Sequence, residues 1–136
     1  MNARLNSVFW SLRIAFGLTA FLAGLDKFFN LLTNWEKYAS PIALQVLPIS
    51  AATLMRISGV IEVIVGLAVL AGVTRIGGYV VCAWLVLIAV NLISTAQYFD
   101  IAVRDLVMAV GAFALAKVSE MREEEMAHAV GSLRTA

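Results

Sequence analysis

Residues 13–29, RIAFGLTAFLAGLDKFF, lie within a long apolar run that also carries three charged side chains, Arg13, Asp26 and Lys27. A charged side chain at the centre of a membrane-spanning helix costs about 2.5–3.5 kcal/mol on scales of membrane insertion. The charged groups in such a run must therefore pair with one another, reach an interface or line a polar cavity. The same conflict recurs in two later apolar stretches of the chain.

The whole chain is more apolar than a typical soluble domain. Of its 136 residues, 62% are hydrophobic and 14% are charged, and the mean hydropathy is +0.91. Soluble domains are nearer to half apolar and a quarter charged. The composition therefore predicts an integral membrane protein with a single domain. The formal net charge of +1 comes without a basic stripe, so we expect no nucleic-acid partner.

Four apolar stretches have roughly the length that a bilayer-spanning helix needs, which is about 20 residues. Most connections between them are short, and short connections force neighbouring helices to be antiparallel. The sequence therefore predicts an all-α fold, an antiparallel four-helix transmembrane bundle over residues 1–118, followed by a charged cytoplasmic C-terminal tail over residues 119–136. We expect the spans at about residues 8–32, 51–72, 75–97 and 101–118.

The connection over residues 33–50 is the one long link. Pro41 and Pro48 exclude a continuous helix there, although a short interfacial helix fits between them. Trp35 and Tyr38 suit the aromatic belt of a membrane interface. Asp100 is a suitable N-cap for the last span.

Positively charged residues that flank the spans predict the orientation of the bundle. The side with both termini carries five of them, whereas Lys37 alone flanks the spans on the opposite side. The five are Arg4, Arg75, Lys117, Arg122 and Arg134. Both termini are therefore expected in the cytoplasm.

The single cysteine and the single histidine restrict the possible redox chemistry. Cys82 has no partner for an intramolecular disulfide or a CxxC motif, and His128 alone excludes bis-histidine haem ligation within the chain. We expect no metal site and no intrinsic cofactor. Any redox reaction would use a diffusible cofactor such as a bound quinone, or the prosthetic group of a partner.

Polar residues of all four spans are expected to share one layer in the outer half of the bundle. With a rise of about 1.5 Å per residue, Glu62 falls near mid-membrane, and the others fall closer to the outer surface. The charged residues of the layer recur on stripes of small residues, which face other helices rather than lipid. The layer consists of Asp26, Lys27, Arg56, Glu62, Asn91, Arg104 and Asp105. Arg13 lies near the cytoplasmic end, from which it can reach the interface.

Two interpretations of this layer stay open. In the first, three acids pair with three bases and only hold the bundle together: Asp26, Glu62 and Asp105 with Lys27, Arg56 and Arg104.

In the second interpretation, the layer forms a pocket for an anionic or quinone-like headgroup. Arg56 and Arg104 hold the headgroup, because a guanidinium offers several donors and stays charged. Glu62 exchanges protons, as an ionisable carboxyl group near mid-membrane. The other charged members orient these three. Asn91 fits an interhelical hydrogen bond better than a contact with the headgroup.

Three segments resemble the DoxX family of small four-helix membrane proteins. The resemblance rests on the order and spacing of Arg13 and Gly17, Gly24 with Lys27, Glu62 with Gly66, and Arg104–Asp105 at the start of the last span. The segments are RIAFGLTAFLAGLDKFF (Arg13 to Phe29), GVIEVIVGLAVLAG (Gly59 to Gly72) and FDIAVRDLVMAVGAFALA (Phe99 to Ala116). The resemblance implies a multi-pass protein of the bacterial cytoplasmic (inner) membrane, and a loose link to quinone-dependent oxidoreductases.

We therefore expect a small subunit of a quinone-linked redox pathway. The alternative is a non-catalytic accessory or assembly subunit of a larger membrane complex. A small-solute transporter is a third alternative, weakened by the absence of an inverted repeat. The expected partners are the lipid bilayer and either a larger membrane redox complex or further copies of the chain. Whether the protein is itself an enzyme stays open.

Overall fold

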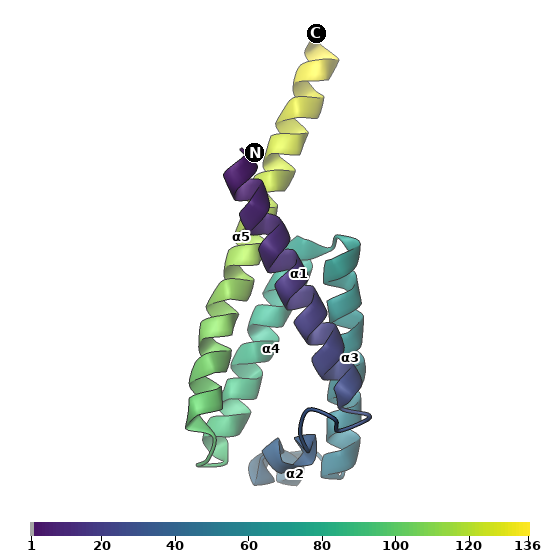
Figure 1. Cartoon of the computed structure of the whole chain (residues 1–136), viewed down its shortest axis with the longest axis vertical. Coiled ribbons are helices and arrows are strands. Elements are labelled where there is room, and N and C mark those ends of the chain that lie inside the picture. Colours follow the sequence, from purple (N-terminus) through teal and green to yellow (C-terminus); the bar gives the residue numbers. More distant parts are fainter. Residues whose placement is uncertain (1) are drawn as a thin grey trace.

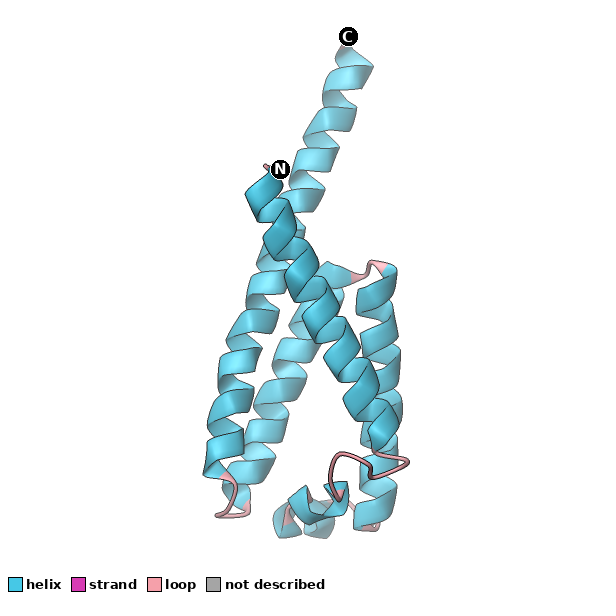
Figure 2. Ribbon diagram, in the orientation of Figure 1, coloured by secondary structure: helices cyan, strands magenta, loops and turns pink. Residues whose placement is uncertain are grey.

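The computed structural model describes residues 2–136, which are helical with short connections and no strand (Figure 2). Three of the helices, α1, α3 and α4, are long and apolar enough to cross a membrane, in agreement with the predicted membrane protein. In chain order, the elements are α1 (Ala3–Asp26), the 3-10 helix η1 (Trp35–Tyr38), α2 (Pro41–Val46), α3 (Ala51–Ala71), α4 (Thr74–Ser94) and α5 (Phe99–Thr135).

The sequence predicted that the first span ends near residue 32, but helix α1 ends at Asp26. The Asp26 carboxylate accepts hydrogen bonds from the backbone N–H groups of Leu31 and Leu32, at 2.9 and 3.0 Å. Asn30 has a positive φ of 54°, which an α-helix does not permit. The chain therefore leaves the helix axis directly after Asp26, and the apolar residues that follow belong to the connection.

Two further boundaries follow from capping. Helix α2 lies between Pro41 and Pro48, where a short helix was predicted, and Ser40 caps it by accepting a hydrogen bond from the Ile42 N–H. Helix α5 is preceded by Tyr98 in the left-handed conformation, so the N-cap assignment of Asp100 was wrong. Asp100 instead lies in the first turn of α5, where the helix dipole favours its charge.

The charged tail predicted over residues 119–136 continues α5 without a break to Thr135. Figure 1 shows this part of α5 extending past the turn between α3 and α4, on the side where both termini lie. The charged tail is therefore an extension of the helix.

The four long helices form two closely packed pairs, α1 with α3 and α4 with α5. In the first pair, glycines bring the two backbones into contact. A Cβ atom on Gly66 would lie 2.5 Å from the backbone nitrogen of Phe21 and 2.8 Å from the carbonyl oxygen of Gly17. A Cβ atom on Gly24 would lie 2.7 Å from the carbonyl oxygen of Gly59. Small residues with this spacing allow membrane helices to approach closely.

The second pair uses a stripe of alanines on α5. Ala109, Ala112 and Ala116 are buried, and a Cβ atom on Gly78 of α4 would lie 2.9 Å from the backbone nitrogen of Ala116. The two pairs meet near the termini, in a core formed by Phe9, Val69, Val81, Ala112 and Leu115. Toward the other end, where α2 lies, they diverge (Figure 1).

Arg13 closes the C-terminal end of α3. Its Nε donates to the carbonyl oxygen of Val69 at 3.1 Å, and its Nη2 donates to that of Leu70 at 2.6 Å. The last carbonyls of a helix lack their usual i+4 partners. The guanidinium supplies a donor to Leu70 and a second donor to Val69, whose carbonyl oxygen also accepts from the Gly72 N–H at 3.2 Å. The Arg13 guanidinium also stacks on Trp10, with Cζ 4.5 Å from the ring centroid.

The backbone contact between α1 and α3 predicts a large effect of a small substitution. Gly66→Ala adds one methyl group against backbone atoms that cannot move aside, so we expect it to destabilise the fold by about 1–3 kcal/mol. Gly131→Ala is the matched control, because no atom lies within 4 Å of its Cβ position. Thermal unfolding in detergent, followed by circular dichroism, measures both. Equal midpoints for Gly66→Ala and the wild type would contradict the backbone contact.

Candidate functional site

A cavity of about 980 Å³ lies between the two helix pairs, at the end of the bundle where they diverge. Its walls are predominantly apolar side chains from four helices, including Phe16, Val65, Leu85, Ile88 and Met108. Residues 33–47, which include η1 and α2, contribute the rest of the lining. The cavity exists because close packing occurs within each pair, while the pairs meet each other tightly only near the termini.

A buried ion pair lies in the wall of the cavity. The Lys27 ammonium is 2.6 Å from Oε2 of Glu62, and each side chain is only 7% exposed. Trp84 donates its indole N–H to the other carboxylate oxygen, Oε1, at 2.9 Å. Both oxygens of Glu62 are therefore bonded.

The contact of α1 with α3 explains why Lys27 reaches Glu62. Lys27 follows the last residue of α1, one turn after Gly24, and Gly24 touches the backbone of Gly59. The Cβ of Lys27 would lie 3.1 Å from a Cβ placed on Gly59. Glu62 is three residues further along α3, on the same face. The ammonium therefore has to extend by only one helical turn.

Asp26 does not line the cavity, although it is buried. In addition to the backbone N–H groups of Leu31 and Leu32, the indole N–H of Trp35 donates a hydrogen bond to its carboxylate at 2.9 Å. The Trp35 ring in turn covers Lys27, whose Nζ lies 4.0 Å from the ring centroid. Asp26 thus holds the connection after α1 against the ion pair.

Asp105 lines the same cavity and is 8% exposed. Within residues 2–136, no group forms a hydrogen bond or an ion pair with its carboxyl group. The carboxyl group therefore faces the cavity, where water or a ligand can form hydrogen bonds with it. Its neighbour Arg104 also lines the cavity but has an exposed side chain, without an ion pair to any described residue.

Asn91 holds the long connection in place. Its Nδ2 donates to the carbonyl oxygen of Tyr38 at 2.7 Å, and its Oδ1 accepts from the N–H of Ser40 at 3.1 Å. Ser40 also bonds to Ser94 of α4, with 2.6 Å between the hydroxyl oxygens. The interhelical hydrogen bond predicted for Asn91 was therefore wrong, because both partners belong to the connection between α1 and α3.

Arg56 was predicted to face inward, and this was wrong. The buried face of α3 consists of Met55, Gly59, Glu62, Gly66 and Val69. Arg56 is one residue, about 100° of rotation, away from Met55 on this face, and its side chain is exposed. It does not line the cavity, and no described residue pairs with it.

The pairing of three acids with three bases is also wrong. Within the part of the chain that the structure describes, Lys27 and Glu62 form the one ion pair of the predicted layer. Asp26 bonds to backbone and indole N–H groups instead. Asp105, Arg56 and Arg104 have no ionic partner among the described residues.

Trp35 and Trp84 also belong to the site, although neither residue was predicted there from the sequence. Trp84 lies within an apolar stretch, and a buried indole N–H usually needs an acceptor. Glu62 was the available acceptor at a similar depth, so the hydrogen bond between Trp84 and Glu62 could have been predicted from the sequence. The role of Trp35 depends on the path of the connection, which no local pattern predicts.

The described residues contain no group of three or more His, Cys, Asp or Glu side chains that could hold a metal ion. Comparisons with protein-family models, curated proteins and solved structures found no match to this chain.

The Lys27–Glu62 pair predicts a strong energetic coupling. Removal of one partner leaves a buried charge without compensation, which typically costs about 3–5 kcal/mol. We expect Lys27→Met and Glu62→Gln each to lower the free energy of unfolding by about this amount, and the double variant to recover part of the loss. Unfolding by denaturant in mixed micelles measures the coupling.

Arg56→Gln is the control for this cycle, because Arg56 is exposed and unpaired among the described residues. We expect no change in its unfolding free energy. Losses that simply add in the double variant would contradict a direct Lys27–Glu62 interaction.

Proposed function

We propose that this protein binds a quinone-type amphiphile in the cavity between its two helix pairs, and that it serves a redox pathway as a small membrane subunit. One observation carries the proposal: an apolar cavity of about 980 Å³ contains a buried ion pair and a carboxyl group without a partner.

The size and the lining of the cavity suit an amphiphile. Sites for small molecules and cofactors typically measure about 300–1,000 Å³ and combine apolar walls with a few polar groups. An aromatic ring and the first part of an apolar tail would contact side chains such as Phe16, Val65 and Met108. A polar headgroup would lie against Lys27 and Asp105.

The polar groups fit the two redox states of a quinone. A quinone oxygen accepts hydrogen bonds, and the Lys27 ammonium has three donors, of which Glu62 takes one. A quinol hydroxyl donates, and an ionised Asp105 carboxylate accepts. Reduction of a quinone to a quinol takes up two electrons and two protons. Asp105 is the better candidate for proton exchange, because both oxygens of Glu62 are already bonded.

The electrons would come from a partner. A prosthetic group in a larger membrane complex would supply or take them. The chain itself would bind the quinone, orient its headgroup and exchange a proton at Asp105.

The proposal includes a fourth span, formed by residues 101–118 of α5, with both termini in the cytoplasm of a bacterial cell. The close packing of α5 against α4 and the excess of flanking positive residues near the termini support this topology. The resemblance to the DoxX family supports it further. In this orientation, the cavity lies in the outer half of the membrane.

Asp105→Asn tests the binding site. Replacement of a charged acceptor by a neutral amide weakens a hydrogen bond worth about 1.5–3 kcal/mol, so we expect the affinity for a quinone to fall about tenfold. The measurement is quenching of tryptophan fluorescence by decylubiquinone in purified protein, because Trp35 and Trp84 line the cavity.

Arg56→Gln provides the control, since Arg56 lies outside the cavity and should not affect quenching. An unchanged affinity in Asp105→Asn, or an equal loss in Arg56→Gln, would rule out this assignment.

A second candidate function, a non-catalytic accessory subunit, is favoured by the extension of α5. The helix continues to Thr135, beyond the turn between α3 and α4, and its last turns are exposed (Figure 1). Such an extension would provide a contact surface for a larger complex. A chain that ends at residue 122 should keep quinone binding but lose co-purification with that complex.

A further inference from the structure

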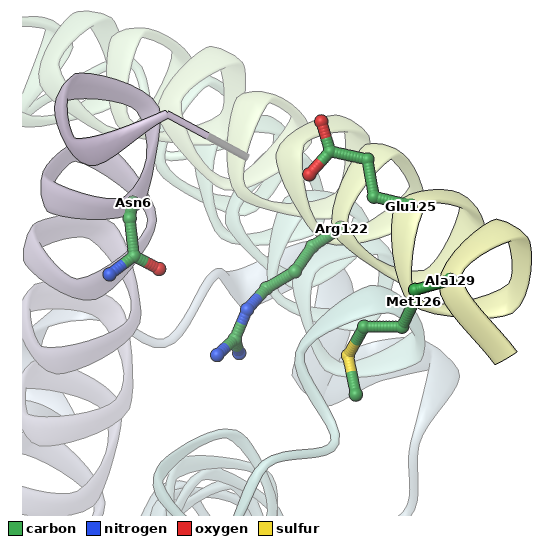
Figure 3. Close-up of a pocket in the computed structure, with 5 residues that line it drawn as sticks. All are labelled: Asn6, Arg122, Glu125, Met126 and Ala129. Atoms are coloured by element: carbon green, nitrogen blue, oxygen red, sulfur yellow. The ribbon is translucent and has the colours of Figure 1, made fainter. Parts of the chain in front are cut away.

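A second cleft lies at the opposite end of the molecule from the cavity, between the first turns of α1 and the extension of α5 (Figure 3). It measures about 400 Å³ and is lined by Asn6, Arg122, Glu125, Met126 and Ala129. Figure 3 shows the side chains of Arg122 and Glu125 both leaving α5 on the side where α1 carries Asn6, with their charged ends pointing apart.

Two aromatic rings of α1 hold Arg122 in position. Its Cζ lies 4.4 Å from the ring centroid of Phe9 and 5.8 Å from that of Trp10. Stacking of this kind uses the faces of the planar guanidinium and leaves the N–H groups at its edge. No described residue accepts a hydrogen bond from Arg122 or forms an ion pair with it. The guanidinium is therefore oriented but not neutralised.

Other cations nearby are already satisfied. Arg75 pairs with Glu120 at 3.7 Å and with Glu123 at 3.4 Å, and Lys117 pairs with Glu120 at 3.3 Å. The Tyr79 hydroxyl and the Lys117 ammonium hold the pKa of Glu120 below its ordinary value, so this carboxylate stays charged. The acidic residues of α5 thus neutralise Arg75 and Lys117 and leave Arg122 available.

The cleft lies at the level where a membrane surface would be. Trp10 stacks with both Arg122 and Arg13, and Arg13 bonds to the last carbonyls of α3. The end of α3, a helix long enough to span, therefore lies near this level. Trp10 is 40% exposed, and tryptophan is enriched at the headgroup level of membranes.

We propose that Arg122 and Asn6 bind a phosphate anion at the membrane surface, on the side of the bundle that carries both termini. The guanidinium can donate two parallel hydrogen bonds to phosphate oxygens. The Asn6 amide can donate another, and the N-terminal end of the α1 dipole favours an anion there. A phospholipid headgroup and inorganic phosphate share this chemistry.

Native mass spectrometry of the purified chain tests the proposal. Phosphatidylglycerol or phosphatidylcholine is added to the protein in a neutral detergent, and the retained lipid is compared. We expect preferential retention of phosphatidylglycerol and an affinity about tenfold lower in Arg122→Gln, because the charge-assisted hydrogen bonds are lost. Arg75→Gln is the matched control, with an expected change below about twofold, since Arg75 is paired with glutamates.

A second variant tests the proposal independently if Arg122→Gln does not fold. Asn6→Asp places a negative charge beside the guanidinium but suits the first turns of a helix, so it should fold and bind phosphatidylglycerol more weakly. Displacement of the lipid by excess inorganic phosphate would identify free phosphate as the ligand, and no displacement would identify the headgroup. Equal retention of the two lipids, or equal losses in Arg122→Gln and Arg75→Gln, would overturn the proposal.

Discussion

The backbone contact between α1 and α3 determines the rest of the arrangement. Gly17 and Gly24 of α1 touch Gly66 and Gly59 of α3 so closely that a single added methyl group would overlap with backbone atoms. This contact sets the register of the two helices. The register places Lys27 within reach of Glu62, and the resulting pair contributes the buried charges of the cavity wall.

The same contact explains why the molecule has a cavity. Glycine and alanine stripes allow each pair of helices to approach closely, but the two pairs share only one compact core, near the termini. Beyond this core the two pairs diverge, and the hydrogen bond from Trp84 of α4 to Glu62 of α3 links them across the cavity. The connection with η1 and α2 covers part of the opening, held by hydrogen bonds from Asn91 and by Asp26. The polar residues of the predicted layer therefore have two roles. Some line the cavity, and others hold the connection that covers it.

The sequence alone predicted the elements well and the site in part. Hydrophobic length located the long helices, and small residues at helical spacing identified the faces of Glu62 and Asp105 correctly. The predicted inward orientation of Arg56 was wrong because a shift of one residue along a helix separates a buried face from an exposed one. A stripe defined by only a few positions does not resolve that angle. The hydrogen-bond partners of Asp26 and Asn91 could not be predicted, because they lie in an irregular connection. The path of such a segment depends on tertiary hydrogen bonds rather than on periodicity.

The cover of the cavity also determines how a ligand would arrive. Ile42 and Val46 of α2 line the cavity, yet 57% and 74% of their respective surfaces are exposed, and neighbouring residues of the connection are equally apolar. Exposed apolar side chains on a short helix beside the spans suit the interface of a bilayer better than water. A ligand would then enter sideways by diffusion in two dimensions, from a membrane in which it is already concentrated. Occupancy would follow its mole fraction in the lipid, so that even a weak site could stay filled.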